Sequence, residues 1–270
     1  MVTVLVTGGT GTVGSRVAAR LVADGVEARV AGRRTEPPLA WEDPSTWPAA
    51  LAAVDAVFLL LPEQTRLPAG FLETATDAGA TRVVLLSDRS AALRRVEYLL
   101  EAERLVRSSG LDWTIVRPDW FQEDFETFFR EPVAGGLLVV PVGEMLQDFV
   151  SANDIGEVAA VALQGGYPGR VLEVTSAERM TFAEALGVIG AEIGRPVAFD
   201  GSAELYREQH LGFGRSRDEV DAEIAAFERL AAAGDVELTD TVSAVLGRAP
   251  VAFAHYVHSA AARGVWREEA

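Results

Sequence analysis

The chain contains no cysteine and no lysine. Without cysteine it can form no disulfide framework, no thiolate nucleophile and no Cys-based metal site. Without lysine it can form no Schiff base, use no lysine as a general base and build no phosphate-binding loop of the type that needs a lysine. These two absences exclude much of the covalent and redox chemistry that a protein performs with its own side chains.

Basic side chains and long apolar runs are also scarce. The 270 residues include 40 acidic and 24 basic side chains, and the formal net charge is −16. Such a field opposes binding to a polyanion, so we expect no nucleic-acid partner. No apolar run reaches the roughly 18 to 20 residues of a membrane-spanning helix, and the N-terminus enters a strand without a basic signal segment. We therefore expect a cytoplasmic protein without a membrane partner.

Apolar, β-branched runs alternate with segments of helical periodicity over the first 118 residues. The run at 54–61 is almost continuously apolar, which is typical of a parallel strand covered on both faces. Strands regularly spaced by helices imply right-handed crossovers and an α/β fold with a doubly wound parallel sheet. The expected strands cover residues 2–7, 27–31, 54–61, 82–87 and 113–116, and the expected helices cover 15–23, 47–53, 71–78 and 91–108.

The pattern loosens beyond residue 118. A short strand at 137–140, a helix from near Asn153 and a strand at 171–174 are expected, and the last ninety or so residues are mainly helical and polar-faced. No Ser/Gly/Pro-rich linker separates them from the rest. We therefore expect a dinucleotide-binding Rossmann domain over 1–150, with sheet contributions from about 151–178, and a small, mainly helical substrate-side lobe over 179–270.

A glycine-rich turn joins the first expected strand to the first expected helix. Glycines at positions 8, 11 and 14 satisfy the spacing of a dinucleotide fingerprint, and the strand-turn-helix context strengthens it. Glycine is needed there for unusual dihedrals, for close approach of the pyrophosphate and for tight helix packing. The alternative is a tight turn that holds no ligand. The residues expected to contact the cofactor are Gly8, Thr10, Gly11, Thr12, Val13 and Gly14.

Two arginines follow the second expected strand. An NAD-preferring site has an acidic residue about twenty positions after the glycines, where it bonds the ribose 2′-hydroxyl. Here Arg33 and Arg34 stand in that region, and guanidinium groups pair bidentately with phosphate oxygens. The pair favours NADP(H) over NAD(H), and the alternative is that the arginines only solvate the surface.

These residues, with Leu-Leu-Ser-Asp at 85–88, Ser-Gly-Leu-Asp-Trp-Thr-Ile-Val-Arg-Pro at 109–118 and Asp-Ile at 154–155, resemble the NmrA-like atypical short-chain dehydrogenase/reductases. Within that group, Trp-Glu-Asp-Pro-Ser-Thr-Trp at 41–47, Val-Asp-Ala-Val-Phe at 54–58 and Gly-Arg-Ala-Pro at 247–250 are similar to reductase-like proteins of ergot alkaloid biosynthesis and their bacterial relatives. The group includes quinone and imine-type reductases and also cofactor-binding regulators that turn nothing over.

The resemblance implies roles for three further segments. Leu61 and Pro62 are expected to close over the cofactor's ribose, and the backbone of Arg117 and Pro118 to lie near the nicotinamide carboxamide. Ser87 matches the serine position of the family, at the C-terminal end of a strand where ligands collect. Its hydroxyl is expected to bond substrate or nicotinamide, or else to cap the following helix.

The source of a catalytic proton is the open question. Ordinary short-chain dehydrogenases use a Tyr-x-x-x-Lys pair, which a chain without lysine cannot form. Alignment on the helix that carries this pair puts Arg95 and Leu99 in its positions. Tyr98 is one residue away, which rotates its side chain by about 100° and should point it away from the cofactor. Asp88 is the nearest carboxyl group, and it is either an acid whose pKa burial raises or a solvated residue near Arg89.

Aromatic side chains crowd the segment after Pro118. Trp120, Phe121, Phe125, Phe128 and Phe129 are compatible with an ordinary helix core or with the apolar wall of a pocket for a flat aromatic ligand. For the pocket we select Trp120, Phe121 and Phe125. No metal site is expected, because the three histidines lack further ligands at suitable spacing.

The leading functional hypothesis is an NADPH-dependent reductase that acts, in secondary metabolism, on an iminium, quinone or conjugated carbonyl. Such acceptors need little general-acid help, so placement of the hydride does most of the work. One alternative is a non-catalytic NADP(H)-binding redox sensor, and another is a redox-neutral cyclase or isomerase in natural-product assembly. The expected partner is a small, aromatic or polycyclic substrate, and the sequence leaves monomer and homodimer open.

Overall fold

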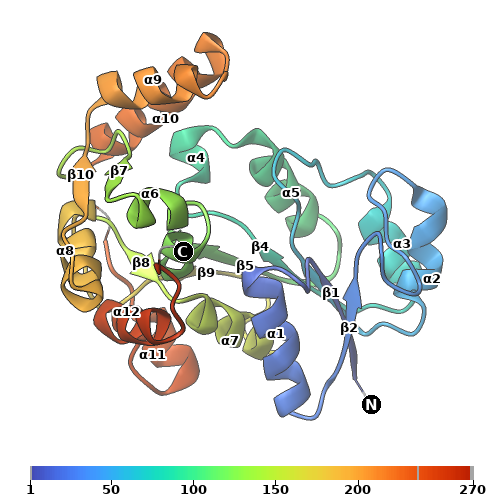
Figure 1. Cartoon of the computed structure of the whole chain (residues 1–270). Helices are drawn as coiled ribbons and strands as arrows, with labels where there is room; N and C mark the ends of the chain where they lie inside the picture. Colours follow the sequence, from blue (N-terminus) through green and yellow to red (C-terminus); the bar gives the residue numbers. More distant parts are fainter. Residues whose placement is uncertain (1, 236, 268–270) are drawn as a thin grey trace.

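A six-stranded parallel sheet forms the centre of the molecule in the computed structural model, which describes residues 2–235 and 237–267 (Figure 1). Every neighbouring pair of strands in it is parallel, which confirms the expected doubly wound α/β fold. In spatial order the strands are β2 (Glu27–Ala31), β1 (Thr3–Thr7), β3 (Ala56–Leu59), β4 (Arg82–Leu86), β5 (Asp112–Pro118) and β9 (Arg170–Val174).

Helices cover both faces of this sheet because its strands are apolar on both sides. Val4 and Val6 of β1 join one apolar cluster and Leu5 joins the other, as the two-residue period of a strand requires. The helices of the first cluster are α1 (Thr12–Ala23), α7 (Ala152–Leu163) and α11 (Thr241–Leu246). The helices of the second cluster are α2 (Trp47–Leu51), α3 (Phe71–Asp77) and α5 (Glu97–Arg107). A short 3-10 turn at Pro44–Thr46 precedes α2.

The single helix expected over 91–108 is two helices, α4 (Ala91–Arg94) and α5. Arg95 adopts a left-handed conformation with φ +60°, and the Val96 amide closes the end of α4 on the Ala91 carbonyl at 2.9 Å. Arg229 donates to the Leu93 carbonyl at 2.9 Å, so a side chain from a distant helix satisfies the last turn of α4. The expectation of one continuous helix was therefore wrong.

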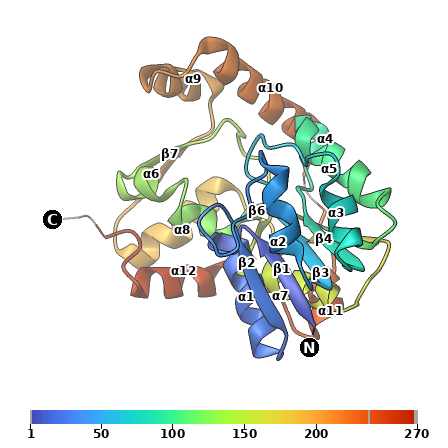
Figure 2. The same ribbon diagram turned by 90° about the vertical axis from the view of Figure 1, so that its right-hand side faces the viewer.

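A second, mainly helical assembly packs beside the sheet (Figure 2). Its apolar cluster includes Phe125 and Phe149 as well as Phe182 and Phe253, so it draws residues from both sides of position 150. The elements here are β6 (Trp120–Phe121), a 3-10 turn (Gln122–Glu126), α6 (Arg130–Ala134), β7 (Leu137–Val139), β8 (Phe149–Val150), α8 (Phe182–Ile193), β10 (Ala198–Asp200), α9 (Ala203–Gly212), α10 (Arg217–Ala233) and α12 (Phe253–Ala262).

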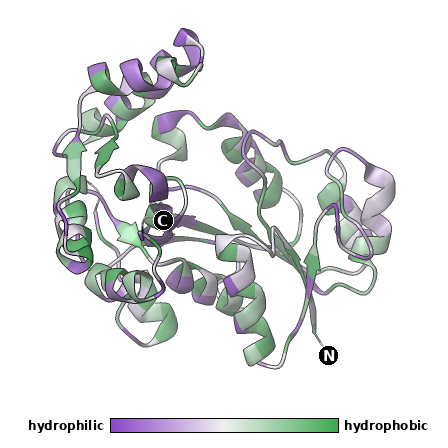
Figure 3. Cartoon of the chain, viewed as in Figure 1, coloured by the Kyte–Doolittle hydropathy of each residue, from purple (hydrophilic) through white to green (hydrophobic). Residues whose placement is uncertain are grey.

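Two short parallel strand pairs organise this assembly, β6 with β8 and β7 with β10. Helix α10 lies beside α4 in both ribbon views, where Arg229 bridges the two. Hydrophilic stretches colour α9 and α10, whereas the central strands are mainly hydrophobic (Figure 3). No helix in the described part of the chain is long and apolar enough to cross a membrane.

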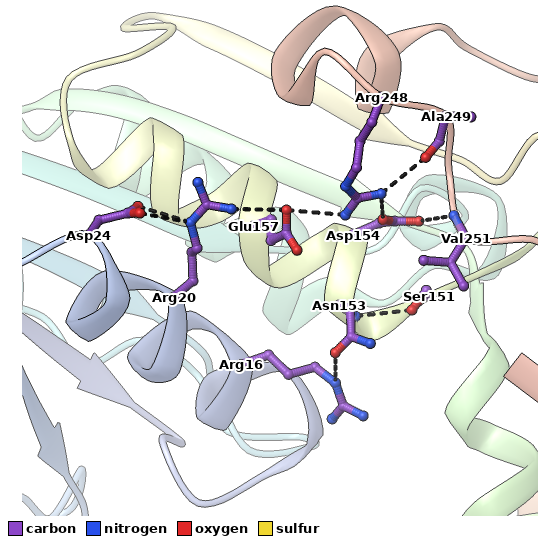
Figure 4. A network of polar contacts seen from close by, with 10 residues as sticks. All are labelled: Arg16, Arg20, Asp24, Ser151, Asn153, Asp154, Glu157, Arg248, Ala249 and Val251. Atoms are coloured by element: carbon purple, nitrogen blue, oxygen red, sulfur yellow. Dashed lines mark hydrogen bonds and ion pairs between the residues drawn. The ribbon is translucent and has the colours of Figure 1, made fainter. Parts of the chain in front are cut away.

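A polar network ties the segment after α11 to the sheet's helices (Figure 4). Asp154 of α7 is fully buried, and its carboxylate pairs with Arg248 at 2.7 Å and accepts the Val251 amide at 2.7 Å. Glu157, one turn later, pairs with Arg248 at 3.1 Å and with Arg20 of α1 at 3.0 Å. These contacts hold Arg248 and Val251 against α7 and α1, the helices on the sheet face where the glycine-rich turn leads into α1.

Candidate functional site

The glycine-rich turn has the geometry that a dinucleotide needs. Gly8 adopts φ +64°, in the left-handed region, directly after β1. A Cβ atom at Gly14 would lie 2.3 Å from the Gly8 carbonyl oxygen, so α1 approaches the turn more closely than any side chain permits. Gly11, at the N-cap of α1, offers no capping side chain, which leaves the positive end of the helix open to an anion. The cradle therefore fits a pyrophosphate.

The end of β3 lies against this turn, at the switch point of the sheet. Thr7 accepts the Leu60 amide at 2.8 Å and donates to the Leu60 carbonyl at 3.0 Å. Leu61 is buried and Pro62 is exposed. Because β1 and β3 are neighbours while their crossovers go to opposite faces, a crevice opens at their carboxyl ends. The structure brings Leu61 and Pro62 to this crevice, and their contact with a ribose stays a prediction.

Arg33 and Arg34 follow β2 at the same edge of the sheet. Thr7 and Ala31 are paired in register, so the turn after β2 starts beside the glycine-rich turn. Both guanidinium side chains are exposed, and neither forms an ion pair with any residue that the structure describes. A free pair of cations at this edge is available to a 2′-phosphate.

Ser87, Glu103 and Arg117 form one hydrogen-bonded cluster at the ends of β4 and β5. The Ser87 hydroxyl donates to Glu103 Oε1 at 2.7 Å, and Arg117 Nε donates to the same oxygen at 2.8 Å. Burial tends to raise the pKa of Glu103, but hydrogen bonds from Arg117 and Ser87 outweigh it and hold the pKa below its ordinary value. Glu103 is therefore a carboxylate at neutral pH, and Ser87 does not cap the following helix.

Asp88 is the residue that shapes the turn into α4. Its Oδ1 accepts the Ser90 amide at 2.6 Å and the Ser90 hydroxyl at 2.7 Å, and its Oδ2 pairs with Arg94 at 3.1 Å. Arg89 turns away to Glu173 at 3.1 Å, so the expected proximity of Asp88 to Arg89 does not become an ion pair between them. With both oxygens engaged, Asp88 is poorly disposed to donate a proton.

A carboxyl group that the sequence reasoning missed lies close by. Asp119 directly follows β5 and is half-buried at the carboxyl edge of the sheet. Burial, with the charges of Asp148 and Asp88, raises the pKa of Asp119 to about 7 against the opposing effect of Arg89 and the Trp120 amide. Its place just after a strand of the sheet was a usable signal, but nothing local indicated the burial.

Tyr98 lies between the loops that follow β3 and β4. Burial raises the pKa of its phenol, and the charges of Glu63 and Asp88 act in the same direction. Its ring also packs against the apolar cluster that α3 and α5 cover. The orientation of the Tyr98 side chain away from the cofactor stays a prediction.

The aromatic segment divides between core and site edge. Phe125 is fully buried and contacts Phe149 and Phe253 edge-on at centroid distances of 5.3 and 5.5 Å. It offers no surface to a ligand, so of the two interpretations the core holds for Phe125 and its selection as a pocket residue was wrong. Trp120 and Phe121 are only partly buried, and they stay candidates for a pocket wall.

No group of three or more metal-ligating side chains could hold an ion within residues 2–235 and 237–267. His258, on α12, instead pairs with Glu192 of α8 at 2.9 Å.

Comparisons with known proteins agree with this geometry. Residues 8–165 match the family model described as NAD(P)H-binding. An NAD(P)H azoreductase of Xenophilus azovorans is 30% identical over 280 residues, covering 96% of this chain and 98% of the relative. Prestalk A differentiation protein A of Dictyostelium discoideum is 33% identical over 220 residues, covering 73% of this chain and 71% of the relative.

Among solved structures, the triphenylmethane reductase of Citrobacter sp. complexed with NADP(H) has the same fold. It superimposes with a TM-score of 0.75 at 17% identity, covering 96% of this chain and all of that chain. The family match spans more than half of the chain, and the sheet, switch point and glycine cradle are those that a dinucleotide requires. The chain therefore belongs to the NAD(P)H-binding family of Rossmann-fold proteins.

Proposed function

We propose that the protein is an NADPH-dependent reductase that delivers hydride to an activated electrophile, such as a quinone, an iminium, a conjugated carbonyl or an azo compound. The observation that carries this proposal is that the Gly8 to Gly14 cradle and the polar cluster of Ser87, Glu103 and Arg117 share the carboxyl edge of one parallel sheet. The near full-length similarity to an azoreductase supports reductive chemistry and adds the azo group to the acceptors.

Different residues would hold different parts of the cofactor. The glycine turn and the α1 N-terminus would hold the pyrophosphate, and Arg33 with Arg34 the 2′-phosphate. When bound, NADPH supplies the hydride. Because the Ser87 proton is committed to Glu103, Ser87 offers a ligand only its acceptor lone pairs, which suits the N–H groups of a carboxamide. The Pro118 carbonyl, in contrast, already accepts the Arg89 amide at 2.9 Å.

The test has two arms. Dissociation constants for NADPH and NADH are compared by fluorescence titration, and NADPH consumption is followed with a quinone, an iminium, an azo dye and a triarylmethyl cation. We expect tighter binding of NADPH and turnover of at least one acceptor. Tighter binding of NADH would refute the role of Arg33 and Arg34, and inertness toward every acceptor would refute the reductase.

A non-catalytic NADP(H) sensor is the second candidate, and the relative named as a differentiation protein favours it. The same assays separate the two, because a sensor binds NADPH tightly and consumes none with any acceptor. A redox-neutral cyclase or isomerase in natural-product assembly would instead convert a substrate without net loss of NADPH.

A further inference from the structure

Two carboxylates from distant parts of the chain become register neighbours at the edge of the candidate site. Strands β6 and β8 pair in parallel, with Trp120 opposite Phe149. Asp119 and Asp148 each precede these paired residues by one position, so they sit side by side at about the 4.8 Å spacing of adjacent strands. The β5 strand ends immediately before Asp119, which sets the pair at the carboxyl edge where ligands bind in such sheets.

The surroundings of this pair contain buried polar atoms without partners. Asp148 is fully buried; its Oδ1 accepts the Ser176 amide at 2.7 Å, and its Oδ2 has no hydrogen-bond partner among the described residues. Arg89 Nη1 is equally buried and unpartnered within that part of the chain, although Arg89 Nε pairs with Glu173. An unmade hydrogen bond of this kind destabilises the fold, and such groups concentrate at functional sites.

Asp119 differs from Asp148 and Arg89 because it lies between these buried groups and the solvent side. It is half-buried, whereas Asp148 is closed off. The Arg89 amide donates to the Pro118 carbonyl at 2.9 Å, which holds the loop after β4 beside the residue that precedes Asp119. A substrate on this edge could therefore meet the Asp119 carboxyl while Asp148 and Arg89 stay behind it.

The charges around Asp119 favour a shared proton. Burial raises the pKa of Asp119 to about 7 and that of Asp148 to about 6, and the negative charge of Asp148 raises that of Asp119 as well. Asp88 adds a second negative charge from the loop after β4. Arg89, from the same loop, opposes both shifts, and Glu173 of β9 partly neutralises Arg89. Of the two carboxyl groups, Asp119 therefore holds its proton to the higher pH.

We propose that Asp119 is the proton donor of the reduction and that Asp148 and Arg89 are positioning residues that keep its proton in place. This inference rests on the proposed reductase function. Two electrons and a hydrogen nucleus pass as hydride from NADPH to the electrophilic atom of the acceptor. The Asp119 O–H bond breaks as its proton joins the acceptor oxygen or nitrogen that gains the electron pair, and water later restores the proton.

The decisive experiment uses two acceptors that differ only in their need for a proton. Reduction of a quinone consumes a hydride and a proton, whereas a triarylmethyl cation becomes neutral on accepting hydride alone. Single-turnover rates are measured for the wild type, Asp119→Asn and the control Asp112→Asn, which makes the same change at the opposite, exposed end of β5. We expect Asp119→Asn to slow quinone reduction by about 100-fold or more while changing cation reduction less than about twofold.

The pH dependence gives a second readout. Wild-type quinone reduction should fall as the pH rises through about 7, because the acid form of Asp119 is the donor, and cation reduction should not follow this group. Asp148→Asn removes the neighbouring negative charge and should move the fall to lower pH. Equal loss with both acceptors in Asp119→Asn, or no loss with either, overturns the inference. A wild type that reduces none of the four acceptors overturns the proposed function instead, and the inference with it.

Infrared titration of the cofactor-free protein tests the acid without turnover. Burial raises the pKa of Asp124 to about 7 as well, so the readout is the difference between two spectra and not the presence of a band. The protonated-carboxyl absorption that disappears near pH 7 should be smaller in Asp119→Asn than in the wild type, and unchanged in Tyr98→Phe. If Asp119→Asn retains all of this absorption, or if Tyr98→Phe rather than Asp119→Asn selectively slows quinone reduction, Asp119 is not the donor.

Discussion

Replacing Gly14 by alanine should impair cofactor binding more than it impairs folding. The added Cβ would lie 2.3 Å from the Gly8 carbonyl oxygen, 2.7 Å from its carbonyl carbon and 2.9 Å from Gly9 Cα. All three are backbone atoms, so no side chain can rotate away, and α1 must retreat by about 1 Å to reach ordinary contact distance. That retreat withdraws the helix N-terminus from the pyrophosphate.

The magnitude follows from two opposing contributions. Overpacking of this kind costs about 1 to 3 kcal/mol, and alanine returns up to about 1 kcal/mol of helix propensity. We expect a net loss of about 1 to 2 kcal/mol in the free energy of unfolding and at least a ~10-fold weaker affinity for NADPH, which corresponds to about 1.4 kcal/mol. Thermal unfolding and NADPH fluorescence titration measure the two effects.

Gly187→Ala is the matched control for this prediction. Gly187 lies inside α8, and a Cβ there would meet no atom within 4 Å. The control should raise the unfolding free energy by up to about 1 kcal/mol and leave NADPH affinity unchanged. Affinity of Gly14→Ala within about twofold of the wild type would refute the idea that close approach of α1 makes the phosphate site.

Three further perturbations test other contacts. Arg33→Glu with Arg34→Glu should weaken NADPH binding by about 100-fold or more while sparing NADH, as titration of both nucleotides would reveal, because each of the two charged hydrogen bonds that are lost contributes about 1.5 to 3 kcal/mol. Glu103→Gln should lower the melting temperature at pH 7. The difference from wild type should shrink in thermal melts as the pH falls below the ordinary Glu value and through the depressed pKa of folded Glu103, because the stabilisation is fully present only above the unfolded pKa. Arg248→Ala leaves the buried Asp154 without its cation and should lower the free energy of unfolding by about 1 to 2 kcal/mol. The loss in thermal melts should be larger at pH 8 than at pH 5, because burial raises the pKa of Asp154 and the unpaired carboxyl group can take up a proton at the lower pH.

Local patterns sufficed for the sheet and the phosphate cradle. The apolar run at 54–61 and the β-branched run at 2–7 indicated buried parallel strands, and β3 and β1 lie within them. The sequence predicted the glycines at 8 and 14 as site residues because both are required by the backbone of a single strand-turn-helix unit. Gly8 has a positive φ, and a Cβ atom at Gly14 would lie 2.3 Å from the Gly8 carbonyl oxygen.

Longer-range contacts decided where the sequence misled. No glycine or proline marks the break between α4 and α5 in the sequence. The end of α4 is instead capped by Arg229, which lies 136 residues away in the chain. Phe125 has the same local pattern as Trp120, and only the packing of Phe149, Phe182 and Phe253 around it assigns it to the core. Periodicity reports which side of an element is apolar and not what covers that side.

By itself the sequence determined that a Rossmann-type sheet forms and that no lysine assists a tyrosine, and it predicts that a dinucleotide binds at the turn after the first strand. The tertiary structure alone decided that the Asp119 carboxyl group is buried beside another carboxylate, which raises its pKa. Asp88 and Asp119 both follow strands of the sheet. The Asp88 carboxylate accepts a hydrogen bond from Ser90 and pairs with Arg94, whereas the Asp119 carboxyl group is buried and lies close enough to Asp148 to feel its charge. A pKa depends on the field of every nearby group, and the pairing of β6 with β8 brings that field from residues 29 positions away.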